Sequence, residues 1–123
     1  MTQEEKQLLL KDLCARLPYG VKCQWDTYYN GILTDVCKCK TKNNFVYWDC
    51  YFEECEDDVP IEIVKPYLRP MSSMTRDESY ELEHIEERYD NHYDSIVAQI
   101  DWLNAHHFDY RGLIPMDLAV EAP

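Results

Sequence analysis

The chain begins with the repeating apolar pattern of an amphipathic helix. Leucines recur at positions i, i+4 and i+8, which lie on one face of a helix: Leu9, Leu13 and Leu17. Thr2 and Glu5 have the spacing of a capping box, in which each side chain accepts a hydrogen bond from the other residue's backbone N–H. Pro18 disfavours helical geometry in the residue before it. We therefore predict a helix over residues 2–17.

Residues 19–66 change to the two-residue period of β-strands. Val21, Cys23 and Trp25 alternate with polar residues, which predicts a half-buried strand. Asn30-Gly31 predicts a type I′ hairpin turn, because these residue types tolerate a positive φ. Further strands are expected over 32–40 and 45–52. The last of these carries bulky side chains on its two faces, so we expect it to be central and covered on both sides.

The end of this β-rich part contains short apolar runs and prolines. Ile61, Ile63 and Val64 predict a short strand or extended segment. Pro66 and Pro70 bracket a segment that we expect to form a rigid turn or one 3₁₀ turn. Short antiparallel strands joined by tight turns are typical of a small SH3-like barrel or a curled sheet.

Two further helices are predicted in the part that spans 75–107. Thr75 and Glu78 repeat the capping-box pattern at the start of a helix that extends to about residue 91. A helix from 95 to 106 follows, with Ile96, Ile100 and Leu103 on one face. Residues 108–123 are expected to form an extended tail. The prediction is a single α+β domain over 1–123, with a leading helix, a small antiparallel barrel or curled sheet, and two C-terminal helices.

The net charge of the chain limits the kinds of molecule that it is expected to bind. The net charge is −12 and the pI is about 4.6. An acidic surface repels phosphate backbones and anionic lipids, so we expect neither direct nucleic-acid binding nor membrane binding. A basic protein surface is the natural partner, although solubility alone also explains a high charge. The N-terminal sequence lacks the basic region of a signal peptide, so we expect a cytoplasmic protein with its six cysteines reduced.

The carboxylates concentrate in a loop over 53–58 and in the helix over 77–94, which together hold 13 of the 24 acidic residues. Carboxylates spaced along a helix can imitate the phosphates of a duplex and so occupy a nucleic-acid-binding groove. The default interpretation is a solvated face. The candidate protein-binding residues are Glu53, Glu54, Glu56, Asp57, Asp58, Glu78, Glu81 and Glu86.

Four of the cysteines suggest an alternative. Thiolates on neighbouring strand ends could bind zinc tetrahedrally, and the candidate ligands are Cys37, Cys39, Cys50 and Cys55. The spacing differs from a standard knuckle, which has two residues between paired cysteines. The favoured interpretation is that these cysteines pack as small hydrophobes. We therefore predict no cofactor, with a small zinc-binding or thiol-dependent protein as the alternative.

No motif for catalysis is present. The chain lacks a nucleophile elbow and a phosphate-binding glycine loop, and it has only three glycines. The four histidines do not have the spacing of a helical metalloprotease site. We therefore predict that the protein is not an enzyme.

Three segments resemble a family of small uncharacterised proteins of gut Bacteroides-type bacteria, their prophages and related mobile elements. They are TQEEKQLLLKDLCARLPYGV at 2–21, VKPYLRPMSSMT at 64–75 and DWLNAHHFDYRGLI at 101–114, and the AVEAP tail shares the resemblance. The resemblance brings no cofactor or catalytic residue. It implies a bacterial cytoplasm and a phage or mobile-element gene, and it leaves residues 22–58 as the variable, specificity-determining part.

The function predicted from these observations is a non-enzymatic protein-binding accessory protein of phage or mobile-element origin. A sharper form of the prediction is an acidic inhibitor of a host defence nuclease. A third possibility is a structural subunit of a larger assembly, with the ten tyrosines at its interfaces. The oligomeric state is left open.

Overall fold

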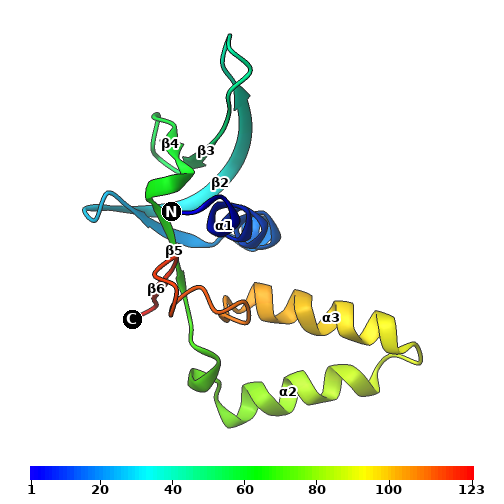
Figure 1. The fold of residues 1–123 in the computed structure, drawn as a ribbon. Coiled ribbons are helices and arrows are strands. Elements are labelled where there is room, and N and C mark those ends of the chain that lie inside the picture. Colours follow the sequence, from blue (N-terminus) through cyan, green and yellow to red (C-terminus); the bar gives the residue numbers. More distant parts are fainter.

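The computed structural model describes residues 1–123 and has an α+β architecture. Figure 1 shows helix α1 beside a sheet, with a hairpin of two helices extending away below it. The helices are α1 (Gln3–Arg16), α2 (Arg76–Glu87) and α3 (His92–Ala105), and the strands are β1 (Lys22–Trp25), β2 (Tyr29–Lys40), β3 (Val46–Phe52), β4 (Val59–Pro60), β5 (Val64–Leu68) and β6 (Val120–Glu121). Short 3₁₀ turns cover Leu17–Tyr19, Ile61–Ile63 and Met71–Ser73. No helix has the length and apolar character that a bilayer span requires.

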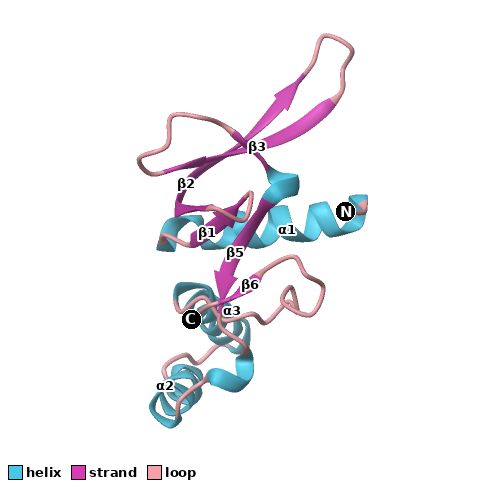
Figure 2. Ribbon diagram, turned by 90° about the vertical axis from the view of Figure 1, so that its left-hand side faces the viewer, coloured by secondary structure: helices cyan, strands magenta, loops and turns pink.

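The six strands form one open sheet in the order β4-β3-β2-β1-β5-β6. Neighbours are antiparallel except β5 and β6, which are parallel. In Figure 2 the β2–β3 ribbon turns strongly relative to β5, and the two edges of the sheet do not meet. The α+β class is confirmed. The sheet is mixed and does not close into a barrel, and its form is consistent with the predicted curled sheet.

The predicted first helix is confirmed, together with its capping box. The Thr2 hydroxyl accepts a hydrogen bond from the Glu5 backbone at 3.1 Å, and the Glu5 carboxylate accepts one from the Thr2 backbone at 2.8 Å. Leu9 and Leu13 are fully buried against the sheet, which places the main core between α1 and the strands. The α-helix ends at Arg16, and Pro18 lies in the 3₁₀ turn that follows.

The predicted hairpin turn at Asn30-Gly31 is wrong. Trp25 pairs with Tyr29, so the turn consists of the three residues between them, and Gly31 lies inside β2. The turn obtains its positive φ values from Asp26 and Thr27 instead. Gly31 serves packing, because a Cβ atom there would lie 3.3 Å from the ring of Trp25. The glycine was therefore a signal for close contact with an aromatic ring, not for a turn.

Two strand assignments also need correction. Strand β3 is not central, because β4 supplies only two residues on its outer side, and Phe45 and Val46 at its start are exposed. The segment after Val64 is a strand instead of a proline-bracketed turn, and Pro66 is buried within it opposite Cys23. A strand tolerates proline where no backbone hydrogen bond from its nitrogen is required. Pro66 meets this condition on the side of β6, because β6 pairs only with residues 67 and 68.

The two C-terminal helices are confirmed with shifted bounds. The capping box of Thr75 and Glu78 is present, and α2 ends at Glu87. Helix α3 begins three residues before the predicted start, because the Asn91 side chain caps it by accepting from the Tyr93 backbone at 2.8 Å. Met74, Leu82, Ile85, Trp102 and Phe108 belong to a small second core under this hairpin.

A buried ionic network joins α1 to the segment that follows α3. The Arg16 guanidinium donates to both oxygens of Asp12, at 2.9 and 3.1 Å, and to the Phe108 carbonyl at 2.6 Å. Arg111 donates to the same Asp12 carboxylate at 2.7 Å. Asp12 and Arg16 are completely buried. These contacts determine where the hairpin of α2 and α3 attaches to the body of the protein.

Candidate functional site

A cavity lies where the sheet meets the base of the helical hairpin. Its volume is about 330 Å³, within the range of small-ligand pockets. The 3₁₀ turn after α1, strands β1 and β5, the end of α3 and the tail contribute to its wall. It is lined by Gly20, Lys22, Tyr67, Arg69, His106, His107, Ala122 and Pro123. No aspartate or glutamate lines it, which is unusual for a chain of this charge.

Arg69 is held in place by contacts below the cavity. Its guanidinium donates two hydrogen bonds to Glu78, at 2.6 and 2.7 Å, and stacks on the Phe108 ring at 4.2 Å. The ion pair with Arg69 lowers the pKa of the Glu78 carboxyl to about 2. The charge of Arg69 is therefore already compensated within the protein.

The two histidines occupy the end of α3. A ring nitrogen of His106 lies 2.9 Å from the Trp102 carbonyl, and the two rings stack at 4.0 Å. His107 has a positive φ of 58°, and its carbonyl accepts a hydrogen bond from the Arg69 backbone at 2.8 Å. Burial of His107 lowers the pKa of its ring, and its Nδ1 atom is buried without a hydrogen-bond partner.

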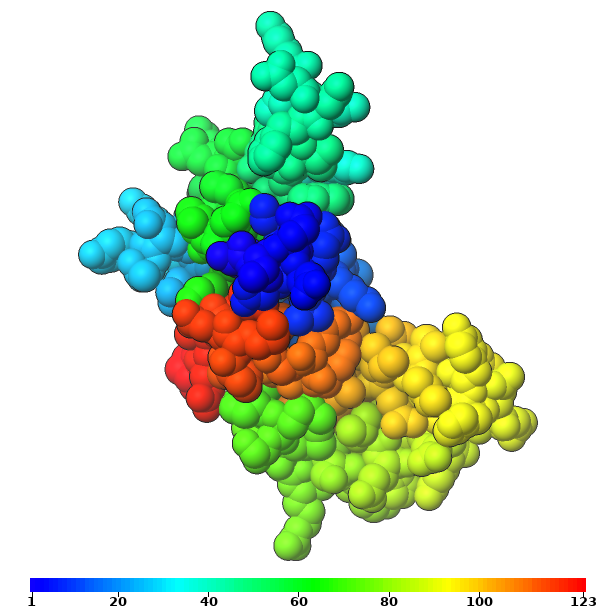
Figure 3. Space-filling view, in the orientation of Figure 1, coloured from blue at the N-terminus to red at the C-terminus, as the bar shows by residue number.

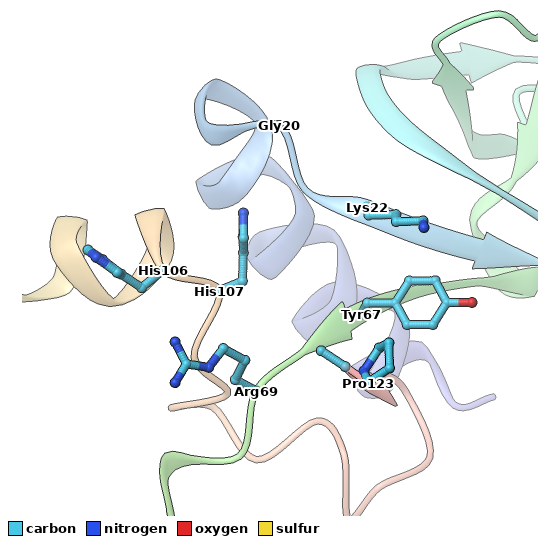
Figure 4. Close-up of a pocket in the computed structure, with 8 residues that line it drawn as sticks. Gly20, Lys22, Tyr67, Arg69, His106, His107 and Pro123 are labelled. Atoms are coloured by element: carbon cyan, nitrogen blue, oxygen red, sulfur yellow. The ribbon is translucent and has the colours of Figure 1, made fainter. Parts of the chain in front are cut away.

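The polar ends of the lining residues do not converge. In Figure 4 the amine of Lys22 and the hydroxyl of Tyr67 point toward one side, whereas the side chains of Arg69 and His106 point toward the other. The Tyr67 hydroxyl donates to Gln24 at 3.1 Å. Acid–base or nucleophilic catalysis needs groups that meet at one reacting atom. This lining brings together no such set.

The predicted acidic residues lie in two separate places. The loop that contains Glu53, Glu54, Glu56, Asp57 and Asp58 follows β3 and leads into β4, whereas α2 lies at the opposite end of the molecule (Figure 1). The carboxylates of the loop are exposed. Asp58 also contacts the buried Asp49, and burial together with this neighbour raises the pKa of the Asp49 carboxyl. The two acidic segments therefore do not form one continuous surface.

The three predicted helix carboxylates have different environments. Glu81 and Glu86 are exposed and take part in no ion pair. Glu78 instead caps α2 and binds Arg69. We therefore assign Glu78 a structural role and keep Glu81 and Glu86 as candidate contact residues.

The structure does not bring the four candidate zinc ligands together. Cys37 lies opposite Asp49, whereas Cys50 lies opposite Val36. Because successive residues of a strand point to opposite faces, Cys50 enters the core on the face away from Cys37 and Cys39. Cys55 lies in the acidic loop, with its thiol 3.6 Å from the Asp57 carbonyl. No group of three His, Cys, Asp or Glu side chains is positioned to hold a metal ion.

The most distinctive surface is on α3 and was not identified as a site in the sequence. We predicted Ile96, Ile100 and Leu103 on one face of this helix, and the structure leaves Ile96 and Ile100 exposed. The buried residues of α3 are Ser95 and Trp102 on its inner side, and Asn104 at its C-terminal end, where Asn104 accepts a hydrogen bond from the Tyr110 hydroxyl. The available signal was that this helix has apolar residues on more than one face, which calls for more than one packing partner.

A shallower groove of about 330 Å³ runs between the two helices of the hairpin. It is lined by Tyr19, Ile85, Arg88, Tyr89, Ala98, Asp101, Trp102 and Ala105. Tyr89 is 45% exposed, and the tip of the hairpin next to it carries Tyr93 at 73%. The hairpin therefore gathers exposed aromatic and aliphatic side chains among its nine carboxylates.

Comparison of the chain with protein-family models, curated proteins and solved structures finds no match. We therefore infer function from the charges, the exposed apolar residues and the shape of the molecule.

Proposed function

We propose that this chain is a non-enzymatic protein-binding accessory protein and that its helical hairpin binds a partner with a basic surface. The single observation that carries the proposal is the charge of the hairpin. Residues 76–105 contain nine carboxylates and two arginines. The resemblance described above would place the protein in a phage or mobile element.

The shape of the molecule supports this proposal. Figure 3 shows the hairpin, in yellow and light green, projecting from the body of the protein at the lower right. Eight of its nine carboxylates are exposed, and the exception is Glu78, which binds Arg69. Complementary charge accelerates encounter with a partner of opposite sign and repels partners of like sign.

A narrower form of the proposal is inhibition of a host nuclease. Exposed carboxylates along α2, such as Glu81 and Glu86, would occupy the positions that phosphates take in a nucleic-acid groove. The acidic loop lies at the other end of the molecule, so mimicry of a duplex would depend on the hairpin alone (Figure 1).

Affinity capture from a host lysate, followed by rebinding of the purified partner, tests this function. Charge reversal of the hairpin (Glu81→Lys with Glu86→Lys) should abolish capture at low salt. The matched control reverses two loop carboxylates, Glu53→Lys with Glu54→Lys, and should leave capture unchanged. Equal capture by wild type and the hairpin variant would contradict the proposal.

The nuclease form has its own measurement. The partner that rebinds should lose its affinity for duplex DNA in the presence of the wild-type chain but not of the hairpin variant. A partner that binds the chain and DNA simultaneously would exclude mimicry while leaving protein binding intact.

A further inference from the structure

We propose that the outer face of α3 is the contact surface for the partner, and that it binds an amphipathic helix whose apolar stripe is bordered by lysines or arginines. We define the outer face as Tyr93, Ile96, Val97 and Ile100. This inference rests on the proposed function and names the surface and the chemistry of the partner.

The spacing of these residues defines a continuous helical face. They occupy positions i, i+3, i+4 and i+7, so they lie side by side along almost two turns of α3. Their exposed fractions are 73%, 41%, 42% and 39% in chain order. Single exposed apolar residues are ordinary, but a contiguous patch of them marks an interaction surface.

The opposite side of α3 is already occupied. Ser95 and Trp102 face inward, and Ala98 packs into the small core with Leu82 of α2. At 3.6 residues per turn, these positions lie about 100–160° around the helix from Ile96 and Ile100. The helix is therefore apolar on two sides, which is the pattern of a helix packed between two partners. The second partner is not another part of this chain, because the hairpin extends past α1 and the sheet (Figure 1).

The carboxylates next to the outer face determine the charge of its partner. Asp94 and Asp101 follow Tyr93 and Ile100 directly in the chain and border the face on one side. Both are exposed, and neither forms an ion pair or a side-chain hydrogen bond within the protein. A partner with a cation beside its apolar stripe would pair with them.

The same charges argue against a second copy as the occupant. Two hairpins, each with nine carboxylates and two arginines, would bring like charges together along the contact. A helix is the favoured partner element because the ridge of Ile96 and Ile100 fits the groove between side chains of another helix. Recognition of this kind is anchored at positions i, i+3, i+4 and i+7.

A designed probe tests the inference without knowledge of the natural partner. The probe is a labelled helical peptide with a leucine stripe bordered by lysines, and fluorescence anisotropy measures its binding to the whole chain. An otherwise identical peptide with glutamates in place of the lysines is the control for charge. We expect the lysine peptide to bind with a saturable curve and the glutamate peptide not to bind.

Substitutions locate the binding site of the probe. Ile96→Asn with Ile100→Asn should weaken binding about tenfold or more, because two apolar side chains lose their contact. Phe45→Asn is the matched control, since Phe45 is 65% exposed at the distant β2–β3 turn. This control should bind as wild type does. Asp94→Asn with Asp101→Asn should weaken binding severalfold and reduce its salt dependence.

The outcomes separate this inference from the proposed function. If the Ile96 and Ile100 variant binds the lysine peptide as tightly as wild type, the outer face is not the contact surface, whereas the hairpin carboxylates can still pass their own capture test. Light scattering that finds a dimer, dispersed by the same two substitutions, would assign the face to a second copy and overturn the inference. Circular dichroism should find an unchanged fold, because these side chains are exposed.

Discussion

Replacing Asp12 should remove a large part of the free energy of unfolding of this protein. Asp12→Leu leaves the guanidinium of Arg16 completely buried, with the Phe108 carbonyl at 2.6 Å as its remaining partner. One nitrogen of that guanidinium, Nη1, already has no hydrogen-bond partner. Breaking a buried ion pair by removing one member costs about 3–5 kcal/mol. A domain of this size is stable by about 5–15 kcal/mol in total.

The loss of stability in Asp12→Leu arises because the buried charge of Arg16 has no counter-ion. Removing the charge of Arg16 as well should therefore restore stability. In Asp12→Leu with Arg16→Met, the completely buried charge of Arg16 is removed and apolar side chains fill the space, whereas Arg111, whose side chain is 14% exposed, still lacks its partner. The Phe108 carbonyl loses a donor, at a cost of about 1 kcal/mol. We therefore expect the double variant to be more stable than Asp12→Leu alone.

Urea denaturation followed by tryptophan fluorescence measures these differences. The single variant should also melt about 10–25 °C below wild type, from about 3–5 °C per kcal/mol for a chain of this length. Lys11→Met is the control on the same helix, because Lys11 is exposed, and its effect should stay within about 0.5 kcal/mol. A loss below about 1 kcal/mol for Asp12→Leu, or a double variant less stable than the single one, would refute the reasoning.

Three further predictions concern packing, pH and thiol reactivity. Gly31→Ala should destabilise the sheet by about 1–2 kcal/mol, because the new Cβ would meet the Trp25 ring at 3.3 Å, and equal unfolding midpoints would contradict this contact. Arg69 depresses the pKa of the Glu78 carboxyl to about 2 from an ordinary value of 4.5, so its contribution to stability is present above pH 4.5 and is lost as the pH falls toward 2. Thermal melts should find a smaller loss across that window for Glu78→Gln than for wild type. Burial raises the pKa of the Cys50 thiol to about 12, so iodoacetamide at pH 8 should modify Cys50 only after the exposed thiols, as peptide mass mapping over time would reveal. Modification at equal rates would mean that this strand opens readily.

Local patterns predicted the helices and most strands because their signals are carried by neighbouring residues. The capping boxes at Thr2 and Thr75 confine two helix starts within four residues each. The alternation of Val21, Cys23 and Trp25 identifies the first strand in the same way. These signals need no knowledge of the rest of the fold.

The errors arose where a distant side chain changed the meaning of a residue. Asn30-Gly31 is a residue pair typical of a turn, but in the fold the Trp25 ring packs against Gly31 where any other residue would have a Cβ atom. Pro66 resembles a turn residue, but it lies in a buried strand whose outer neighbour begins one residue later. In the sequence Glu78 resembles the other carboxylates of its helix, and only the fold brings Arg69 beside it.

The candidate binding surfaces also have some properties that follow from the sequence and others that depend on the fold. The amino-acid sequence is sufficient to establish that the chain is acidic, where its carboxylates concentrate and which segments are amphipathic, because these properties are summed along the chain. The folded structure is needed to show that the loop and the hairpin lie apart, that Cys50 points away from Cys37, and that Ile96 and Ile100 remain exposed. Which face of a helix is covered depends on what packs against it, and that is determined by contacts between residues far apart in the chain.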